Sequence, residues 1–169
     1  MELADAMLTR RSVRKFTDKK VERETVTKIL HAAMSGPSAC NRTPWEFYVV
    51  TDADTMKELR KASKFSNIQA PLAIIVAGNL KRALPMQMAS YWVQDCSAAT
   101  ENILLSAVDN SLGAVWCGIY PQERAEEKVR HILSLPDSEI PLNIIFLGYP
   151  AEKTEPRDQY DEKYIHFVE

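Results

Sequence analysis

The densest group of chemically capable side chains is a basic run at residues 10–15. Its four cations are Arg10, Arg11, Arg14 and Lys15, and Ser12 adds a hydroxyl donor. Each arginine presents a planar fork of N–H donors that can bind a phosphate through two hydrogen bonds, so the run is a candidate anion site. A solvated surface patch is the alternative. A nucleic-acid interface is disfavoured, because the rest of the chain adds no matching basic surface.

Two further stretches are candidate binding segments. Residues 36–45 form a polar loop in which Pro37 and Pro44 limit the freedom of the backbone, and this loop carries more side-chain donors than a connector requires. A plain connector is the alternative. In the apolar stretch 112–120, Gly118 indicates a bulge or a close approach of the backbone by a ligand. Cys117, in the same stretch, is expected to be an inert buried thiol.

Missing motifs exclude several kinds of site. No GxGxxG follows a predicted strand, no GxxxxGK occurs, and only five glycines are present, which excludes a Rossmann or P-loop nucleotide site. His31, His131 and His166 lie far apart without metal-binding spacing, so no metal site is expected. No serine stands in a GxSxG elbow, so a hydrolase triad is unsupported.

Helices and strands alternate along the chain, which indicates layers of an α/β or α+β protein. Apolar periodicity predicts helices over residues 2–9, 22–35, 86–110 and 123–133, and one from Asp52 or Asp54 to about Ser63. Strands are predicted over residues 45–51, 71–78, 113–120 and 142–147, with a late strand at 164–168. The run 71–78 is apolar throughout, which is typical of a strand covered on both faces.

Two regions need a surface that the rest of the chain does not supply. The helix over residues 86–110 is apolar nearly all round, so we expect it to lie centrally or against a partner subunit. The last twenty residues are charged and irregular and cannot form a core alone. We expect them to lie over another surface, such as a second subunit.

The composition is that of one globular domain. A chain of 169 residues, 46% of them apolar, is long enough to form one hydrophobic core and too short for two independent domains. Residues 1–169 are therefore expected to form a single domain. With 21 basic and 23 acidic residues, the formal net charge of −2 argues against a general polyanion binder. Three unpatterned cysteines, no signal-peptide core and no apolar run of membrane length predict a cytoplasmic protein without a membrane partner.

Taken in order, several stretches resemble the nitroreductase family of flavin-dependent oxidoreductases. The resemblance rests on residues 10–16 (RRSVRKF), 37–47 (PSACNRTPWEF), 94–99 (QDCSAA), 112–118 (LGxxWCG), 147–150 (LGYP) and Arg157. Each piece alone is weak, but the combination is specific and spans nearly the whole chain. It identifies a short-chain member without the helical insertion that longer members place over the flavin. Thr43 stands where many members have Gln, and Cys40 also departs from the common residue, which leaves the substrate open.

The resemblance implies an α+β fold, a three-layer α/β/α sandwich around a central mixed, mainly antiparallel sheet. It further implies an obligate homodimer with one FMN in each of two interface sites, and a C-terminal tail that reaches the partner subunit. The helix 86–110 and the unsupported tail agree with this implication, because both need a partner surface.

The same resemblance implies which residues hold FMN. The phosphate, the ribityl chain and the ring edge would be held by Arg10, Arg11, Ser12 and Arg14, with Arg157 closing the phosphate site. The ring would be contacted from the other subunit by Pro37, Ser38, Ala39 and Asn41. Backbone groups around Cys117, Gly118 and Ile119 would lie near the flavin N5. Several donors suit a phosphate, and these arginines supply them.

The implied activity is that of an enzyme that takes hydride from NADH or NADPH onto flavin N5. It would then reduce a small acceptor, such as a nitroaromatic or a quinone, by a ping-pong mechanism, and no side chain is predicted as acid or base. Phe65, Tyr91 and Trp92 are candidates for lining the ring face, although core packing is favoured for each. The alternatives are a specialised member such as a reductive dehalogenase or a flavin-fragmenting enzyme, a flavin-storing or flavin-sensing protein without turnover, and a phosphate-binding module without flavin.

Overall fold

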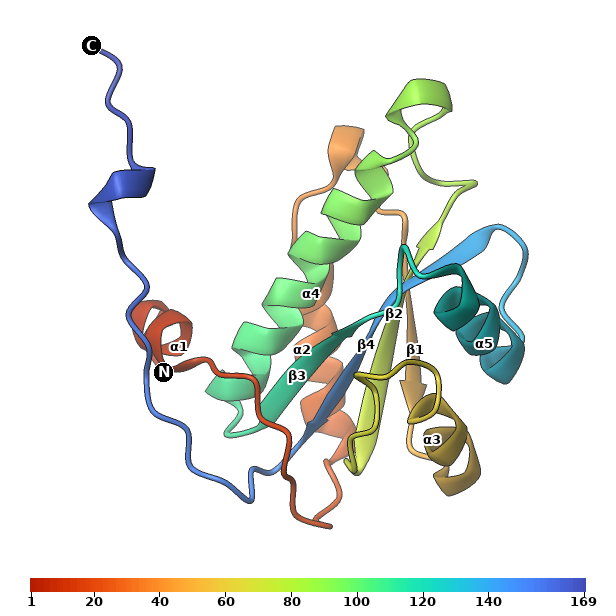
Figure 1. The fold of residues 1–169 in the computed structure, drawn as a ribbon, viewed down its shortest axis with the longest axis horizontal. Helices are drawn as coiled ribbons and strands as arrows, with labels where there is room; N and C mark the ends of the chain where they lie inside the picture. Colours follow the sequence, from red (N-terminus) through yellow and green to blue (C-terminus); the bar gives the residue numbers. More distant parts are fainter.

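The centre of the molecule is a four-stranded sheet in the order β1-β2-β4-β3 (Figure 1). The computed structural model describes all of residues 1–169. Its strands are β1 (Trp45–Val50), β2 (Leu72–Asn79), β3 (Gly113–Gly118) and β4 (Glu139–Gly148). All three strand pairs are antiparallel, and the one parallel pairing is an isolated bridge between Ser12 and Ala114. The sheet is therefore mainly antiparallel, as predicted.

Strand β2 faces a hydrophobic cluster on each side of the sheet. Leu72, Ile74 and Val76 belong to one cluster, whereas Ala73 and Ile75 belong to the other. This division follows from strand geometry, because successive side chains point to opposite faces. Every residue of β2 except Asn79 is buried, which confirms a strand covered on both faces.

Helices cover both faces of this sheet (Figure 1). One face carries α2 (Arg23–Met34) and α4 (Tyr91–Asp109). The other face carries α3 (Ala53–Leu59) and α5 (Glu123–Leu133). The short α1 (Leu3–Thr9) packs against α4, outside these layers. The three-layer α/β/α sandwich is confirmed.

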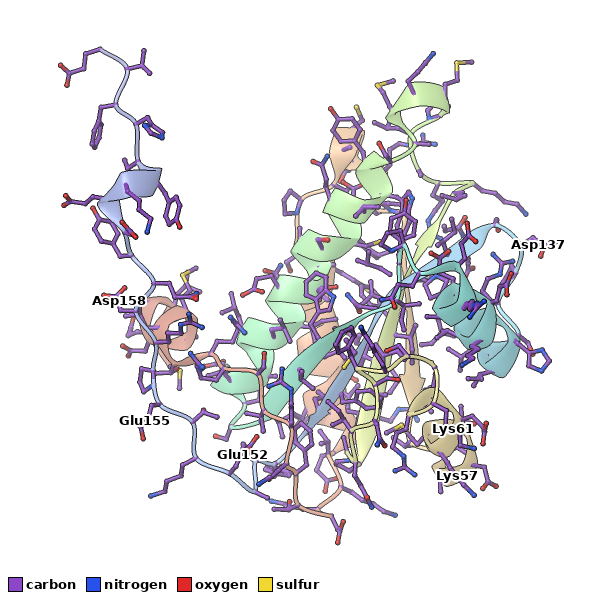
Figure 2. All side chains as sticks on the ribbon, viewed as in Figure 1. Lys57, Lys61, Asp137, Glu152, Glu155 and Asp158 are labelled. Atoms are coloured by element: carbon purple, nitrogen blue, oxygen red, sulfur yellow. The ribbon has the colours of Figure 1, made fainter.

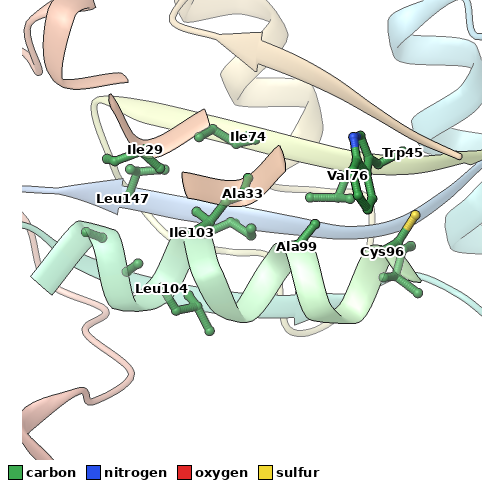
Figure 3. Close-up of a cluster of buried hydrophobic side chains, with 14 of the residues drawn as sticks. Ile29, Ala33, Trp45, Ile74, Val76, Cys96, Ala99, Ile103, Leu104 and Leu147 are labelled. Carbon is green, nitrogen blue, oxygen red and sulfur yellow. The ribbon is translucent and has the colours of Figure 1, made fainter. Parts of the chain in front are cut away.

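Helical spacing explains the larger cluster, part of which Figure 3 shows. On α4, Cys96, Ala99 and Ile103 recur three and four residues apart and are fully buried, and Ile29 and Ala33 do the same on α2. Burying one large aliphatic side chain contributes about 1.5–3 kcal/mol, so this contact is a main source of stability. The apolar α4 is thus central, which was one of its two predicted environments.

The long helix begins later than the sequence predicts. Met86 has a left-handed backbone, with φ of 55°, and an α-helix cannot include it. Met86–Met88 form a separate 3₁₀ turn, η2, and α4 starts at Tyr91. The prediction of a helix from residue 86 is therefore wrong over its first five positions.

The C-terminal tail leaves the body of the molecule and runs beyond α1 (Figure 1). The strand predicted at residues 164–168 is wrong for the single chain, which has a 3₁₀ turn, η3 (Glu162–Tyr164), followed by unpaired backbone. A strand needs a neighbour for its N–H and C=O groups, and none lies beside these residues. No helix combines the length and apolar character that crossing a bilayer requires.

Candidate functional site

The basic run lies along the edge of β3 and is held there by alternating side chains. Val13 is buried, and its backbone N donates to the carbonyl O of Ala114 at 3.0 Å. Because side chains alternate along extended backbone, Ser12 and Arg14 point away from Val13, and both are exposed. A Cβ on Gly113 would lie 2.7 Å from Val13, so glycine at that position permits the close approach.

The beginning of the tail fixes the run from its other side. The backbone N of Ala151 donates to the carbonyl O of Lys15 at 2.9 Å. Glu152 Oε1 accepts a hydrogen bond from the backbone N of Arg14 at 2.8 Å (Glu152 is labelled in Figure 2). This N–H group stabilises the ionised carboxylate and lowers the pKa of Glu152 from its ordinary value.

Further along the tail, Arg157 lies close to the basic run. A cleft of about 340 Å³ is lined by Met7, Arg10, Arg11, Ser12, Arg14, Arg157 and Gln159. Four guanidinium groups converge on this arginine cleft, and no carboxylate lines it. One of them is partly engaged, because Arg10 Nε lies 3.4 Å from Glu101 Oε1. The cleft is therefore electropositive and offers the forked donors that suit a phosphate.

The structure thus brings together every residue predicted for the phosphate, the ribityl chain and the ring edge, namely Arg10, Arg11, Ser12, Arg14 and Arg157. Gln159 and Met7 also line the arginine cleft and were not predicted. No sequence signal marks them, since the tail has no periodicity and Met7 reads as a surface position of α1.

The predicted loop residues lie elsewhere in the same chain. They are Pro37, Ser38, Ala39 and Asn41, and none of them lines the arginine cleft. Asp95 of α4 is 5% exposed and accepts a hydrogen bond from the backbone N of Ala39 at 2.8 Å. Cys40 and Asn41 have left-handed backbones, at φ of 49° and 52°, a conformation that costs about 1–3 kcal/mol per residue and often occurs at functional sites. The loop is held in one shape away from the arginines.

Strand β3 ends beside open space. A Cβ built on Gly118 would meet no atom within 4 Å, and Gly118 is only partly buried. Cys117 and Ile119 are buried in the cluster on the α3 and α5 face, so their side chains are not available to a ligand. The backbone N–H of Ile119 is also engaged, with the carbonyl O of Leu142 at 3.0 Å. Among the three predicted residues, Gly118 therefore leaves the most room for a ring.

The thiol of Cys117 is inert, as expected. Burial raises its pKa to about 11, and Sγ donates to the carbonyl O of Phe65 at 3.3 Å.

The three aromatic candidates for lining the ring face differ in their burial. Trp92 is buried and packs edge-to-face on Tyr120 with ring centroids 5.0 Å apart, which confirms core packing. Phe65 and Tyr91 are 59% and 42% exposed, so core packing is wrong for both.

The arginine cleft and the open end of β3 lie along one strand edge. Ala114, which pairs with the basic run, and Gly118 are four residues apart, about 13 Å at about 3.3 Å per residue. A ligand with a phosphate at one end and a flat ring at the other suits this arrangement. No three His, Cys, Asp or Glu side chains gather as metal ligands.

Comparisons with known proteins identify relatives of the whole chain. Residues 7–71 and 65–149 match the model of the nitroreductase family. A protein of Methanothermobacter thermautotrophicus, named as a candidate NADH dehydrogenase/NAD(P)H nitroreductase, is 42% identical over 98% of this chain and 86% of its own length.

Solved structures give the same result. A crystal structure from Bacteroides thetaiotaomicron, of a candidate NADH dehydrogenase/NAD(P)H nitroreductase, has a TM-score of 0.92 and 42% identity over 98% of this chain and 96% of that one. The FMN-dependent nitroreductase of Clostridium difficile has a TM-score of 0.89 and 29% identity over 98% of this chain and 99% of that one. The similarity therefore includes the fold and extends over nearly the whole length of the chain.

Proposed function

Because the chain belongs to the nitroreductase family, we propose that it is an FMN-dependent oxidoreductase that is reduced by NADH or NADPH and passes the electrons to a small acceptor. Relatives named as an NAD(P)H nitroreductase, an NADH dehydrogenase and an FMN reductase support an oxidoreductase. The acceptor class proposed is a nitroaromatic or a quinone, used in alternation with the nicotinamide cofactor.

The arginine cleft is the observation that carries this proposal. A phosphate monoester has close to two negative charges at neutral pH, and Arg10, Arg11, Arg14 and Arg157 surround one cavity with no opposing carboxylate in its lining. The hydroxyl of Ser12 adds a neutral donor. These residues fit the phosphate end of FMN, and the open space at Gly118 fits its ring end, because a side chain there would occupy that space.

When bound, FMN supplies the hydride acceptor and donor, flavin N5, so the protein needs no nucleophile of its own. The chain's residues bind and orient it. The backbone at Gly118 would lie beside the ring, and Arg14, which lines the arginine cleft beside β3, would contribute positive charge nearby. Positive charge beside the ring favours the electron-rich state of the cofactor and thus its reduction.

The proposed active form is a homodimer. Leu3, Met7 and Leu8 on α1 are each more than half exposed, and the tail exposes Tyr164 and Phe167, so both segments present apolar side chains to a partner. We propose that the end of each tail, which carries Tyr164 and Phe167, lies on the other subunit, while Arg157 stays in the arginine cleft of its own chain. The binding site of the flavin ring would then be completed by four residues of that other subunit, namely Pro37, Ser38, Ala39 and Asn41. The single chain holds these residues away from its own arginine cleft.

The phosphate assignment predicts that Arg14→Ala combined with Arg157→Ala releases FMN from a folded protein. Both side chains are exposed, so the fold should survive. Each lost charge-assisted contact weakens binding by about 1.5–3 kcal/mol, so the Kd for FMN should rise about a hundredfold or more. Flavin fluorescence titration measures this Kd, with Lys57→Ala combined with Lys81→Ala as a control of equal charge change. Unchanged FMN affinity in the arginine variant would refute the assignment.

A further inference from the structure

A second, larger cleft lies between the segment that follows α3 and the N-terminus of α5. Its volume is about 850 Å³. Its lining includes the charged and polar side chains of Lys61, Lys64, Gln122, Glu123, Arg124 and Lys128. Four cations thus face one carboxylate, in a protein whose net charge is −2. This lysine cleft concentrates positive charge against the average of the molecule and therefore attracts anions.

Most of this charge is available to a ligand. Lys61 is paired with Glu58 at 2.7 Å (Figure 2 labels Lys61, just after α3, and Lys57 on the helix itself). Lys64, Arg124 and Lys128 form no salt bridge. The Nζ of Lys128 donates to the carbonyl O of Lys61 at 3.4 Å, which joins the two walls. Three cations therefore remain without an anionic partner.

The lysine cleft begins where β3 ends. Gln122, in its lining, donates from Nε2 to the carbonyl O of Gly118 at 3.4 Å. On the opposite wall, Lys64 precedes Phe65, whose carbonyl O accepts from Cys117 Sγ at 3.3 Å. Both walls are thus attached to β3 within one residue of Gly118. The arginine cleft includes Ser12, which is bridged to Ala114 near the other end of the strand, so the two basic clefts lie toward the two ends of β3.

We propose that the lysine cleft binds the diphosphate of the nicotinamide dinucleotide while its nicotinamide lies beside Gly118. This inference rests on the proposed function, which places the flavin ring at Gly118. The dinucleotide has a flat ring and, one ribose away, two phosphates that are each negatively charged at neutral pH. Lys64 and Arg124 supply the opposite charge next to the ring position, and the arginine cleft is left to the FMN phosphate. The acceptor, with no diphosphate, has no need of these cations.

The test compares Lys64→Ala combined with Arg124→Ala against the wild type, both loaded with FMN. Both residues are exposed, and neither forms a salt bridge, so folding should not change. Stopped-flow anaerobic reduction should give an approximately tenfold higher Kd for NADH or NADPH, with the limiting rate unchanged, since two exposed charge contacts contribute about that much together. The Kd of the wild type should rise more steeply with salt than that of the variant. Lys57→Ala combined with Lys81→Ala is the matched control.

A second readout does not depend on flavin reduction. ADP-ribose, which has the diphosphate without the nicotinamide, should bind the wild type in calorimetry and bind the double variant about tenfold more weakly. Equal affinity of both proteins for ADP-ribose, or none in the wild type, would overturn the inference. A changed KM for an anionic nitroaromatic with an unchanged Kd for the nucleotide would also overturn it. If ADP-ribose affinity falls as expected but wild-type flavin is not reduced, the dinucleotide site stands and the proposed function fails.

Discussion

Single residues set the geometry of the site through contacts that are distant in sequence. The basic run is visible in the sequence as a cluster of cations, but Val13, which docks it on Ala114, is an ordinary apolar residue there. Asp95 and Ala39 are joined by a hydrogen bond across 56 positions, which no local pattern reveals. Arg157 could be assigned only through the family resemblance, because its path to the arginine cleft depends on how the tail runs.

Two glycines give a prediction at this scale. Gly118→Ala places a Cβ in open space, so the free energy of unfolding of the variant should stay within about 0.5 kcal/mol of the wild-type value. The FMN affinity of the variant should fall, because the methyl group occupies the proposed position of the flavin ring. Gly78→Ala places a Cβ 2.2 Å from Trp92 and should lose about 1–3 kcal/mol of stability. Urea denaturation and flavin titration measure both effects. Wild-type FMN affinity in Gly118→Ala would place the ring elsewhere.

At the scale of elements, periodicity predicted most of the sheet and helices. The α5 helix has the predicted bounds, and Asp52 caps α3 by accepting from the backbone N of Thr55 at 2.9 Å. Strand β4 begins three residues before its predicted start, because its first residues pair with the end of β2. Glu139, which is buried against the hydroxyl of Tyr48, gives no apolar signal of this extension. Periodicity locates apolar faces, and it does not detect elements that are ordered by polar contacts or by a partner.

The junction between the basic run and the tail predicts a pH dependence. Hydrogen bonding from the Arg14 backbone lowers the pKa of Glu152 below its ordinary value of 4.5. A lowered folded-state pKa means that the carboxylate stabilises the protein above pH 4.5 and loses this effect as the pH falls through the folded value. Glu152→Gln should therefore lower Tm near neutral pH, with a difference from the wild type that disappears in acid. A difference that grows in acid would contradict this assignment.

At the scale of the whole molecule, one chain holds the two groups of residues proposed for the flavin site apart from each other. The arginine cleft lies beside α1 and the tail, whereas the loop of Ala39 is fixed to Asp95 near the start of α4. The tail also presents Phe167, 86% exposed, to solvent. The sequence already predicted that the tail needs a partner surface, and the exposed Phe167 agrees with that prediction.

Complementation between subunits tests this arrangement. Asn41→Ala should impair the flavin site of the opposite subunit, and Arg14→Ala combined with Arg157→Ala should impair the site of its own subunit. A mixed dimer of the two variants should therefore regain one intact site and bind FMN at half of the wild-type stoichiometry. Affinity-tagged mixed dimers can be isolated and their flavin content measured by absorbance. No regained FMN in verified mixed dimers would contradict a site shared between subunits.

The most direct test of the central claim is the visible absorption spectrum of the FMN-loaded protein under anaerobic conditions, recorded before and after addition of NADH or NADPH. The arginine cleft and the open end of β3 predict a bound flavin whose bands bleach rapidly and return when a quinone or nitroaromatic is added. Bands that persist with both nicotinamide cofactors, or a protein that retains no flavin, would contradict an NAD(P)H-dependent flavin oxidoreductase.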